Sequence, residues 1–207
     1  MIELYDVGRV ITGPFEDGYR FIAEQGEKYI DDKVALERIR AFHKDRKLGI
    51  SQEDFNWLNQ AWVQAIKKGE LPVNPAELVY RDVKPRFEKV RARGDLVWLL
   101  TSGSVELTDL LIRDEAEYDE VLVGEDIGDK NHPETYAKVW DIAEGNVNAF
   151  FDDKPSALQA AYEGFRMAGG NPSLYFVDRD GIVPQEKIKK LESRGIIRII
   201  SFDRIRD

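Results

Sequence analysis

Several apolar runs of the sequence end at groups that could bind a phosphate or a metal ion. In chain order these groups are Asp6 after IELY, Thr101, Ser102 and Gly103 after VWLL, Lys130 after EVLVG and a loop, and Asp152 and Asp153 after VNAFF. Carboxylates are good ligands for hard divalent cations such as Mg²⁺. A threonine hydroxyl, backbone N–H groups and a lysine ammonium suit phosphate oxygens. The residue types therefore indicate a combined phosphate and metal site.

Asp152 and Asp153 place two like charges side by side at the end of an apolar run. A divalent cation shared with Asp6 would offset their repulsion. A simpler alternative is that both carboxylates cap a helix that begins near Pro155, because acidic residues suit helix N-termini. We favour metal binding for Asp153.

The other candidates also have simple structural alternatives. Asp6 could cap a turn after a strand, the stretch 101–103 could be an ordinary glycine turn, and Lys130 could be one of many solvated lysines. We favour the functional interpretation because these residues occur together, each after a predicted strand.

Short β-rich runs recur along the chain, and most are followed by a stretch with helical spacing. The β-rich runs are 2–5, 97–101, 120–124, 147–151, 173–177 and 196–202. This alternation predicts an α/β fold with a mainly parallel, Rossmann-like sheet. Ligands bind outside the carboxyl ends of the strands in such sheets, so we expect the candidate groups to converge there.

The segment from about residue 14 to 80 is helical in character. Apolar residues recur there at intervals of three and four, and SQEDFNWLNQAWVQAIKKG opens with a Ser-x-x-Asp cap. The sequence therefore predicts two domains. One is an α/β core made of residues 1–13 and 81–207, and the other is an all-helical insertion made of residues 14–80.

The overall composition limits the classes of function. Hydrophobic residues make up 43% of the 207 residues and charged residues 33%, which is typical of a globular protein. The net charge of -9 argues against a nucleic-acid or membrane partner, since those anionic surfaces repel an acidic protein. Cysteine is absent, which excludes thiolate metal sites. With no apolar run near the roughly 20 residues of a membrane span, and no signal-peptide pattern, we expect a cytoplasmic protein.

The order of these motifs resembles that of the haloacid dehalogenase-like hydrolases. VKPRFEKVRARGDLVWLLTSGS is similar to the helix, glycine turn and strand that lead to the family's second motif. DKNHPETYAKV is close to the pattern Lys-Pro-x-Pro-Glu-x-Tyr, with Asn131 in place of the first proline, and FFDDKPSALQAA is similar to the Asp-Asp fourth motif. The resemblance covers nearly the whole chain, and a helical cap inserted between the first two motifs is typical of one large subgroup.

The resemblance implies roles for the groups that would contact phosphate. Asp6 would attack phosphorus and carry an aspartyl-phosphate. Thr101, with the backbone N–H groups of Ser102 and Gly103, would hold the transferring oxygens. Lys130 would balance the charge of both the nucleophile and the phosphate.

The resemblance also implies a Mg²⁺ site. Asp153, and less directly Asp152, would position the ion beside Asp6, and Gly8 would offer its backbone carbonyl. The expected partner is a small phosphorylated metabolite, whose identity the sequence does not determine. The oligomeric state is equally open.

The first motif departs from the family pattern Asp-x-Asp-x-Thr. Here the stretch reads DVGRVIT, with Gly8 in place of the second aspartate, which protonates the leaving group in phosphatases of the family, and Val10 in place of the threonine. A Mg²⁺-dependent phosphatase remains the leading hypothesis, because the Asp-Asp motif favours retained metal binding. Two alternatives stay open: a relative that acts on a carbon–halogen or carbon–phosphorus bond, and a non-catalytic binding descendant.

Overall fold

The computed structural model describes residues 1–205 of the chain. Within them a 6-stranded sheet is formed by β1 (Ile2–Asp6), β2 (Leu96–Thr101), β3 (Glu120–Val123), β4 (Val147–Asp152), β5 (Ser173–Val177) and β6 (Ile197–Ile199). The strand order is β3-β2-β1-β4-β5-β6, and every neighbouring pair is parallel. The predicted Rossmann-like sheet is confirmed.

The strand order creates a switch point between β1 and β4. From β1, the chain adds β2 and β3 on one side of the sheet and then β4, β5 and β6 on the other. Connections that leave in opposite directions open a crevice at the carboxyl ends of the two central strands. Asp6 ends β1 and Asp152 ends β4, so the topology places both carboxylates at this crevice.

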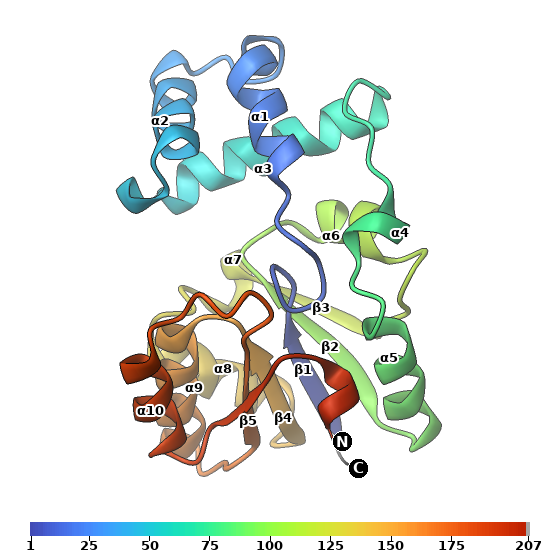
Figure 1. Cartoon of the computed structure of the whole chain (residues 1–207), viewed down its shortest axis with the longest axis vertical. Coiled ribbons are helices and arrows are strands. Elements are labelled where there is room, and N and C mark those ends of the chain that lie inside the picture. The colour runs from blue at the N-terminus through green and yellow to red at the C-terminus, as the bar shows by residue number, and fades with distance from the viewer. Residues whose placement is uncertain (206–207) are drawn as a thin grey trace.

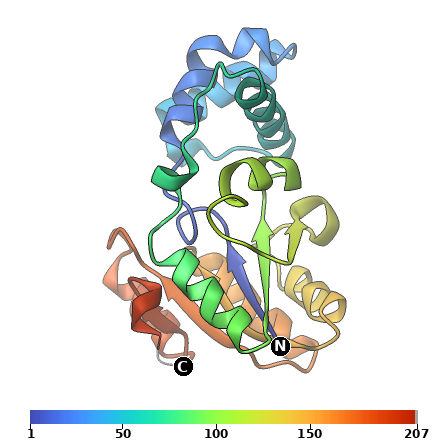
Figure 2. The same cartoon turned by 90° about the vertical axis from the view of Figure 1, so that its right-hand side faces the viewer.

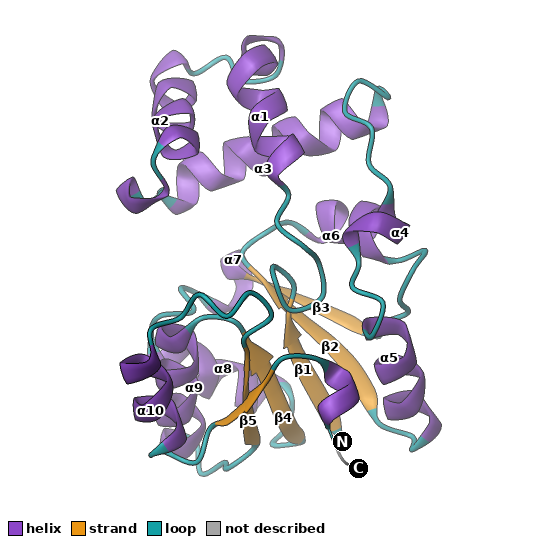
Figure 3. Cartoon of the chain, in the orientation of Figure 1, coloured by secondary structure: helices purple, strands orange, loops and turns teal. Residues whose placement is uncertain are grey.

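Helices cover both faces of the sheet (Figure 1, Figure 3). The helices that cover the sheet are α5 (Val83–Ala92), α6 (Val105–Ile112), α8 (Pro133–Ile142), α9 (Pro155–Met167) and α10 (Gln185–Glu192). Successive residues of a strand point to opposite faces. Tyr5 and Phe151 therefore enter the core with α5 and α6, while Leu4 and Phe150 enter the core with α8, α9 and α10. Both faces of the sheet are buried, as expected for a parallel sheet.

Two one-turn helices were not predicted. They are α4 (Pro75–Leu78) and α7 (Gly124–Ile127). A helix of four residues makes a single turn, so it has no repeating apolar pattern that would distinguish it from a loop.

The inserted helices lie above the carboxyl ends of the strands and form a cap. They are α1 (Glu16–Gln25), α2 (Lys33–Lys44) and α3 (Gln52–Lys67), with a 3₁₀ turn at Gly26–Lys28. In Figure 2 the blue and green arrows of β1 and β2 point toward these helices. The predicted start of α3 is confirmed, because the hydroxyl of Ser51 accepts a hydrogen bond from the Asp54 N–H at 3.1 Å.

Aromatic side chains hold the cap helices together. The Trp62 ring on α3 lies 4.8 Å from the ring of Tyr19, 5.1 Å from that of Phe15 and 6.4 Å from that of Phe55, measured between centroids. All these pairs meet edge to face, the arrangement that aromatic quadrupoles favour. These rings pack the cap helices against one another, and the buried apolar residues of the cap are continuous with the core on the α5 and α6 face of the sheet.

The two connections between the cap and the sheet run side by side (Figure 2). The N–H of Gly13 donates to the carbonyl of Leu78, and the N–H of Tyr80 donates to the carbonyl of Ile11, both at 2.9 Å. Thr12 and Val79 form an antiparallel bridge between these bonds. The predicted domain boundaries lie between residues 13 and 14 and between residues 80 and 81, at the ends of these paired stretches. These boundaries stay a prediction.

None of the helices within residues 1–205 combines the length and the apolar character that a membrane span requires.

Candidate active site

Lys130 lies against Asp6 although 124 positions separate them in the sequence. Its Nζ donates a hydrogen bond to Asp6 Oδ1 and a second one, at 3.3 Å, to the carbonyl of Leu100. The same Nζ is 3.4 Å from Asp152 Oδ2. All three charged side chains are buried. Buried charges are tolerated when they are paired, so the lysine holds the carboxylates in place.

The turn before α8 explains the position of Lys130. Asp129 Oδ1 accepts the Asn131 N–H at 2.9 Å, and the Asp129 carbonyl accepts the Thr135 hydroxyl at 2.6 Å. Pro133 then occupies the first turn of α8, where its missing N–H costs nothing. The helix start is thus locked immediately after Lys130, and its ammonium group is directed to the switch point.

Three carboxylates gather at the same point. One oxygen of each of Asp6, Asp152 and Asp153 lies within 4.8 Å of the others. Asp152 Oδ1 accepts the Lys154 N–H at 2.7 Å. Asp153 Oδ1 is buried and has no hydrogen-bond partner within residues 1–205. A buried carboxylate oxygen without a donor is costly, and a hard cation is the ligand that would satisfy it. This oxygen-only donor set fits Mg²⁺.

Burial, and then the neighbouring charges, shift the pKa values of these groups. Burial raises the pKa of Asp153 to about 7, and the charges of Asp6 and Asp152 add to the rise. Burial also raises the pKa of Asp152 to about 6, against the opposing effect of Lys130. Burial by itself lowers the pKa of Lys130, but Asp6 and Asp152 outweigh it, and the net pKa is raised. The ammonium keeps its charge, and the acidic cluster is not fully balanced by it.

Thr101 ends β2, one residue after Leu100, which pairs with Asp6 in the sheet. Its Oγ1 accepts the Gly103 N–H at 2.9 Å, so its own proton is free to donate to a ligand. A Cβ added at Gly103 would make a tight contact, 3.2 Å from Thr101 Oγ1, so the small residue suits this turn. The next residue, Ser104, caps α6 through the Leu107 N–H. The loop 101–103 is therefore a compact, fixed turn at the edge of the crevice.

Gly8 lies in the turn that follows β1 and is exposed. The Ile11 and Thr12 N–H groups both donate to the carbonyl of Val7 at 3.0 Å, and Arg9 adopts a left-handed backbone with φ of 61°. Open space surrounds Gly8 on its side-chain side, since an added Cβ would meet no atom within 4 Å. Gly8 itself is not among the glycines with positive φ.

The structure brings most of the predicted groups together. Asp6, Lys130, Asp152 and Asp153 form one cluster, and the loop 101–103 lies at the end of the adjacent strand. Gly8 is two residues beyond Asp6, in the turn above it. The roles that these residues have toward a phosphate or a metal stay predictions.

Some residues near the site were not predicted. Asn59 of α3 lies beside the Gly103 turn, with its Oδ1 3.6 Å from where a Cβ of residue 103 would be, and Arg9 pairs with Asp180 at 3.3 Å. Arg9 and Asp180 also line a small cavity of about 40 Å³ beside Asp153. No motif marks these residues, and the only signal at Asn59 is a polar residue between the apolar residues of a helix.

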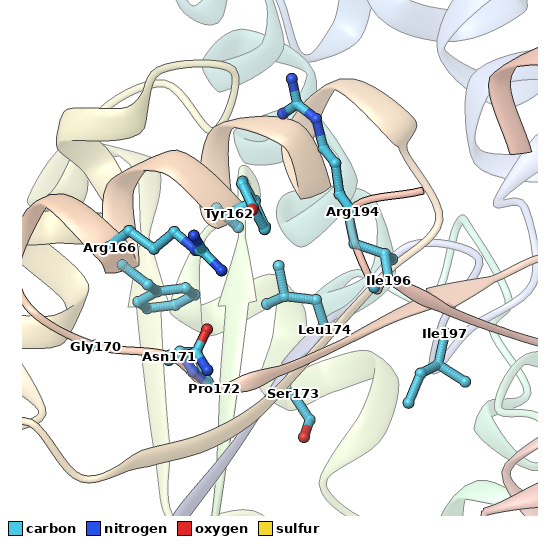
Figure 4. A pocket seen from close by; sticks show the side chains of 13 residues that line it. Tyr162, Arg166, Gly170, Asn171, Pro172, Ser173, Leu174, Arg194, Ile196 and Ile197 are labelled. Carbon is cyan, nitrogen blue, oxygen red and sulfur yellow. The ribbon is translucent and has the colours of Figure 1, made fainter. Parts of the chain in front are cut away.

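A larger cavity, of about 270 Å³, lies elsewhere (Figure 4). It is lined by the start of β5 and by residues near the ends of α9 and α10, away from the carboxyl ends of the strands. Arg166 and Arg194 both lie over the Tyr162 ring, with guanidinium carbons 4.3 and 5.3 Å from its centroid. Arg194 also pairs with Glu163 at 3.1 Å. None of the predicted site residues lines this cavity.

No protein-family model matches the sequence, and no curated protein matches it. Solved structures do match over nearly the whole chain. A dehalogenase is 16% identical, with 98% of this chain and 93% of that chain covered and a TM-score of 0.59. A putative β-phosphoglucomutase from Thermotoga maritima is 17% identical, with 97% and 94% covered and a TM-score of 0.59. A putative haloacid dehalogenase-like hydrolase from Bacteroides fragilis is 17% identical, with 91% and 92% covered and a TM-score of 0.56.

The chain therefore has the fold of the haloacid dehalogenase-like hydrolases, with an inserted helical cap. The resemblance first seen in the motifs is confirmed for the fold. The names of the matching proteins include a dehalogenase and a phosphoglucomutase. The fold alone does not select among such reactions, so function must be argued from the site.

Proposed function

We propose that the protein is a Mg²⁺-dependent phosphatase that acts on a small phosphorylated metabolite through an aspartyl-phosphate on Asp6. The observation that carries this proposal is the buried hydrogen bond from Lys130 to Asp6 beside the carboxylates of Asp152 and Asp153. A carboxylate nucleophile, a fixed ammonium and an oxygen-only cation site are the groups that phosphoryl transfer requires.

In the first step an Asp6 carboxylate oxygen attacks phosphorus. The bond between that oxygen and phosphorus forms while the bond from phosphorus to the leaving oxygen breaks. In the second step water attacks the same phosphorus, which releases inorganic phosphate and restores the Asp6 carboxylate. Holding Asp6 in one orientation makes its attack effectively intramolecular, and the hydrogen bond from Lys130 provides that orientation.

The loop 101–103 and Lys130 stabilise the charge of the transferring group. The Thr101 hydroxyl proton, left free by the Gly103 hydrogen bond, donates to a phosphate oxygen. The Ser102 N–H is a further donor in the same turn, whereas the Gly103 N–H, which the sequence also assigned to phosphate, already donates to Thr101 Oγ1. Lys130 keeps its positive charge because the adjacent carboxylates raise its pKa.

Asp6, Asp152, Asp153 and the Gly8 carbonyl are the groups that would hold Mg²⁺. When bound, the ion offsets the negative charge of the carboxylates and of the phosphate. Asp153 Oδ1, which has no hydrogen-bond partner in the part of the chain that the structure describes, supports this assignment.

Because residue 8 is glycine, the proposed site has no general acid at this position. It provides no side chain to protonate the leaving oxygen, so that oxygen takes its proton from water. General acid and base assistance contributes about 10²- to 10⁴-fold in rate. We therefore expect slow turnover, fastest for activated aryl phosphates, whose leaving groups need no proton.

Gly8 also supports a second candidate function. Without the acid, the same site could bind a phosphorylated ligand without turnover, or serve cleavage of a carbon–halogen or carbon–phosphorus bond. The acidic cluster weighs against metal-free carbon–halogen chemistry, because it contains a carboxylate oxygen that has no donor within residues 1–205.

The test is release of p-nitrophenol from p-nitrophenyl phosphate with and without Mg²⁺. We expect turnover that needs Mg²⁺ and falls to background in Asp6→Asn. Asp126→Asn, an exposed carboxylate on α7, is the matched control and should behave as the wild type. Turnover that is unchanged in Asp6→Asn, or is absent from the wild type with every phosphate ester, would contradict the proposal.

A further inference from the structure

Asn59 is a buried polar residue of the cap whose side-chain oxygen has no hydrogen-bond partner among the described residues. It lies on α3 and is 3% exposed. Its Oδ1 is fully buried and accepts no hydrogen bond within residues 1–205. Buried side-chain oxygens are nearly always hydrogen-bonded, so an exception of this kind needs an explanation.

The amide of Asn59 lies against the turn that is proposed to hold phosphate. A Cβ added at Gly103 would be 3.6 Å from Asn59 Oδ1 and 3.2 Å from Thr101 Oγ1. Asn59 Oδ1 and Thr101 Oγ1 therefore both lie close to the position that a side chain at residue 103 would take. A side chain at residue 103 would therefore occupy the space between the cap and the turn.

Neighbouring polar residues of α3 fix its position on the core. Gln52 donates to the carbonyl of Ser102 at 3.4 Å, and Asn56 donates to Glu125 Oε1 at 3.3 Å. Further along the helix, Lys67 pairs with Glu106. These residues and Asn59 recur at helical spacing, so they share the face that is turned to the core. Asn59 differs from the others because it is buried and makes no bond to the core.

We propose that Asn59 binds a hydroxyl group of the substrate and so selects hydroxylated phosphate esters, the class that includes sugar and polyol phosphates. This inference rests on the proposed phosphatase function. The Lys130 ammonium and the Thr101 hydroxyl serve the phosphate group, which leaves the cap amide for the organic part of the substrate. A hydroxyl both donates and accepts, so it matches a carboxamide, which offers an acceptor oxygen and donor N–H groups.

The preference should be visible in matched pairs of substrates. Glycerol 3-phosphate and propyl phosphate differ only in hydroxyl groups, and glucose 6-phosphate can be paired with cyclohexylmethyl phosphate. We expect the wild type to prefer the hydroxylated member of at least one pair, measured as kcat/KM for phosphate release with Mg²⁺. In Asn59→Ala that preference should fall about tenfold, mainly through KM, because the substrate hydroxyl loses its buried partner.

Propyl phosphate and p-nitrophenyl phosphate should be turned over equally by Asn59→Ala and the wild type. Gln60→Ala is the matched control, since Gln60 is adjacent and exposed. Asn59→Asp, which keeps an acceptor at the same place, should retain part of the preference. Equal losses on all esters would assign Asn59 a purely structural role and overturn the inference, as would no loss on any ester.

A binding measurement separates this inference from the proposed function. The rise in melting temperature caused by each ester with Mg²⁺ is recorded for the wild type and Asn59→Ala. If nothing is turned over, the phosphatase proposal fails. An Asn59-dependent preference for the hydroxylated ester in this binding measurement would still support the recognition role, and no difference within either pair would overturn it.

Discussion

The residue with the clearest chemical consequence is Gly8, where a phosphatase of this fold would carry an acid. The structure leaves room for one, because an added Cβ meets no atom within 4 Å and the Gly8 backbone is not left-handed. We therefore predict that Gly8→Asp raises phosphate release from esters with poor leaving groups by about 10²-fold or more, through proton donation to the leaving oxygen. The gain with p-nitrophenyl phosphate should be smaller.

Gly8→Asn is the control for this substitution, because it matches the size of aspartate but transfers no proton. Phosphate release is measured for alkyl and aryl esters with all three proteins. Equal rates for Gly8→Asp and Gly8→Asn would show that position 8 does not act as an acid in this fold.

The buried carboxylates give a pH dependence with a defined sign. Because the pKa values of Asp152 and Asp153 are raised to about 6 and about 7, these groups hold protons at acidic pH when no metal is present. Mg²⁺ binds the carboxylate form, so binding must release protons. We predict that Mg²⁺ affinity increases as pH rises through this range and levels off above it.

Isothermal titration calorimetry in buffers of different ionisation enthalpy measures both the affinity and the protons released. In Asp153→Asn we expect weaker binding with a smaller pH dependence. An affinity that does not change with pH in the wild type would contradict the raised pKa values or the metal site.

Among the elements, the packing of α8 on α9 places the helix that begins just after the Lys130 turn. A Cβ at Gly164 on α9 would collide with the carbonyl oxygen of Pro133 and would lie 2.8 Å from the Tyr136 Cβ. Gly164 therefore permits the two helices to approach at the start of α8, three residues after Lys130. We predict that Gly164→Ala lowers the free energy of unfolding by about 1 to 3 kcal/mol through overpacking and reduces phosphatase turnover by displacing Lys130.

Chemical denaturation and phosphate release measure these two effects. Glu163→Ala, at the adjacent and partly exposed position, is the control and should change the free energy of unfolding by no more than about 0.5 kcal/mol. If Gly164→Ala is as stable and as active as Glu163→Ala, the close approach of the two helices does not position the lysine.

At the scale of the whole molecule, the cap covers the carboxyl ends of the strands and is joined to the core by two chain connections (Figure 1). Polar side chains of α3 also contact the core. These connections are hydrogen-bonded to each other between residues 11–13 and 78–80. Because the two connections are hydrogen-bonded to each other, the cap can move as a hinge about one axis but cannot rotate freely. Substrate access to Asp6 would then depend on this motion.

We predict that Mg²⁺ with orthovanadate, a phosphate mimic, slows hydrogen exchange in residues 14–80. The reason is that closing the cap over a bound anion shields the amides that face the core. Exchange is followed by mass spectrometry, with Mg²⁺ alone and the Asp6→Asn variant as controls. Unchanged exchange in residues 14–80 would show that the cap is a fixed structural domain.

The strands and the main site followed from local features of the sequence. Runs such as VWLL and VNAFF predict buried parallel strands, and parallel strands bring their carboxyl ends to one edge of the sheet. Asp6, Thr101 and Asp153 could therefore be expected to meet without knowledge of any long-range contact. Lys130 was found from its motif, because the turn that positions it is local in sequence.

Other features of the site depend on contacts that only the tertiary structure shows. The spacing of apolar residues shows which face of α3 is buried, but it does not show which part of the chain covers that face. Only the docking of the cap places Asn59 against Gly103. Likewise, the Asp-Asp pair is visible in the sequence, whereas the absence of a partner for Asp153 Oδ1 depends on every segment packed around it. Such contacts join residues far apart in the chain, so they are fixed by the packing of whole elements and not by local propensity.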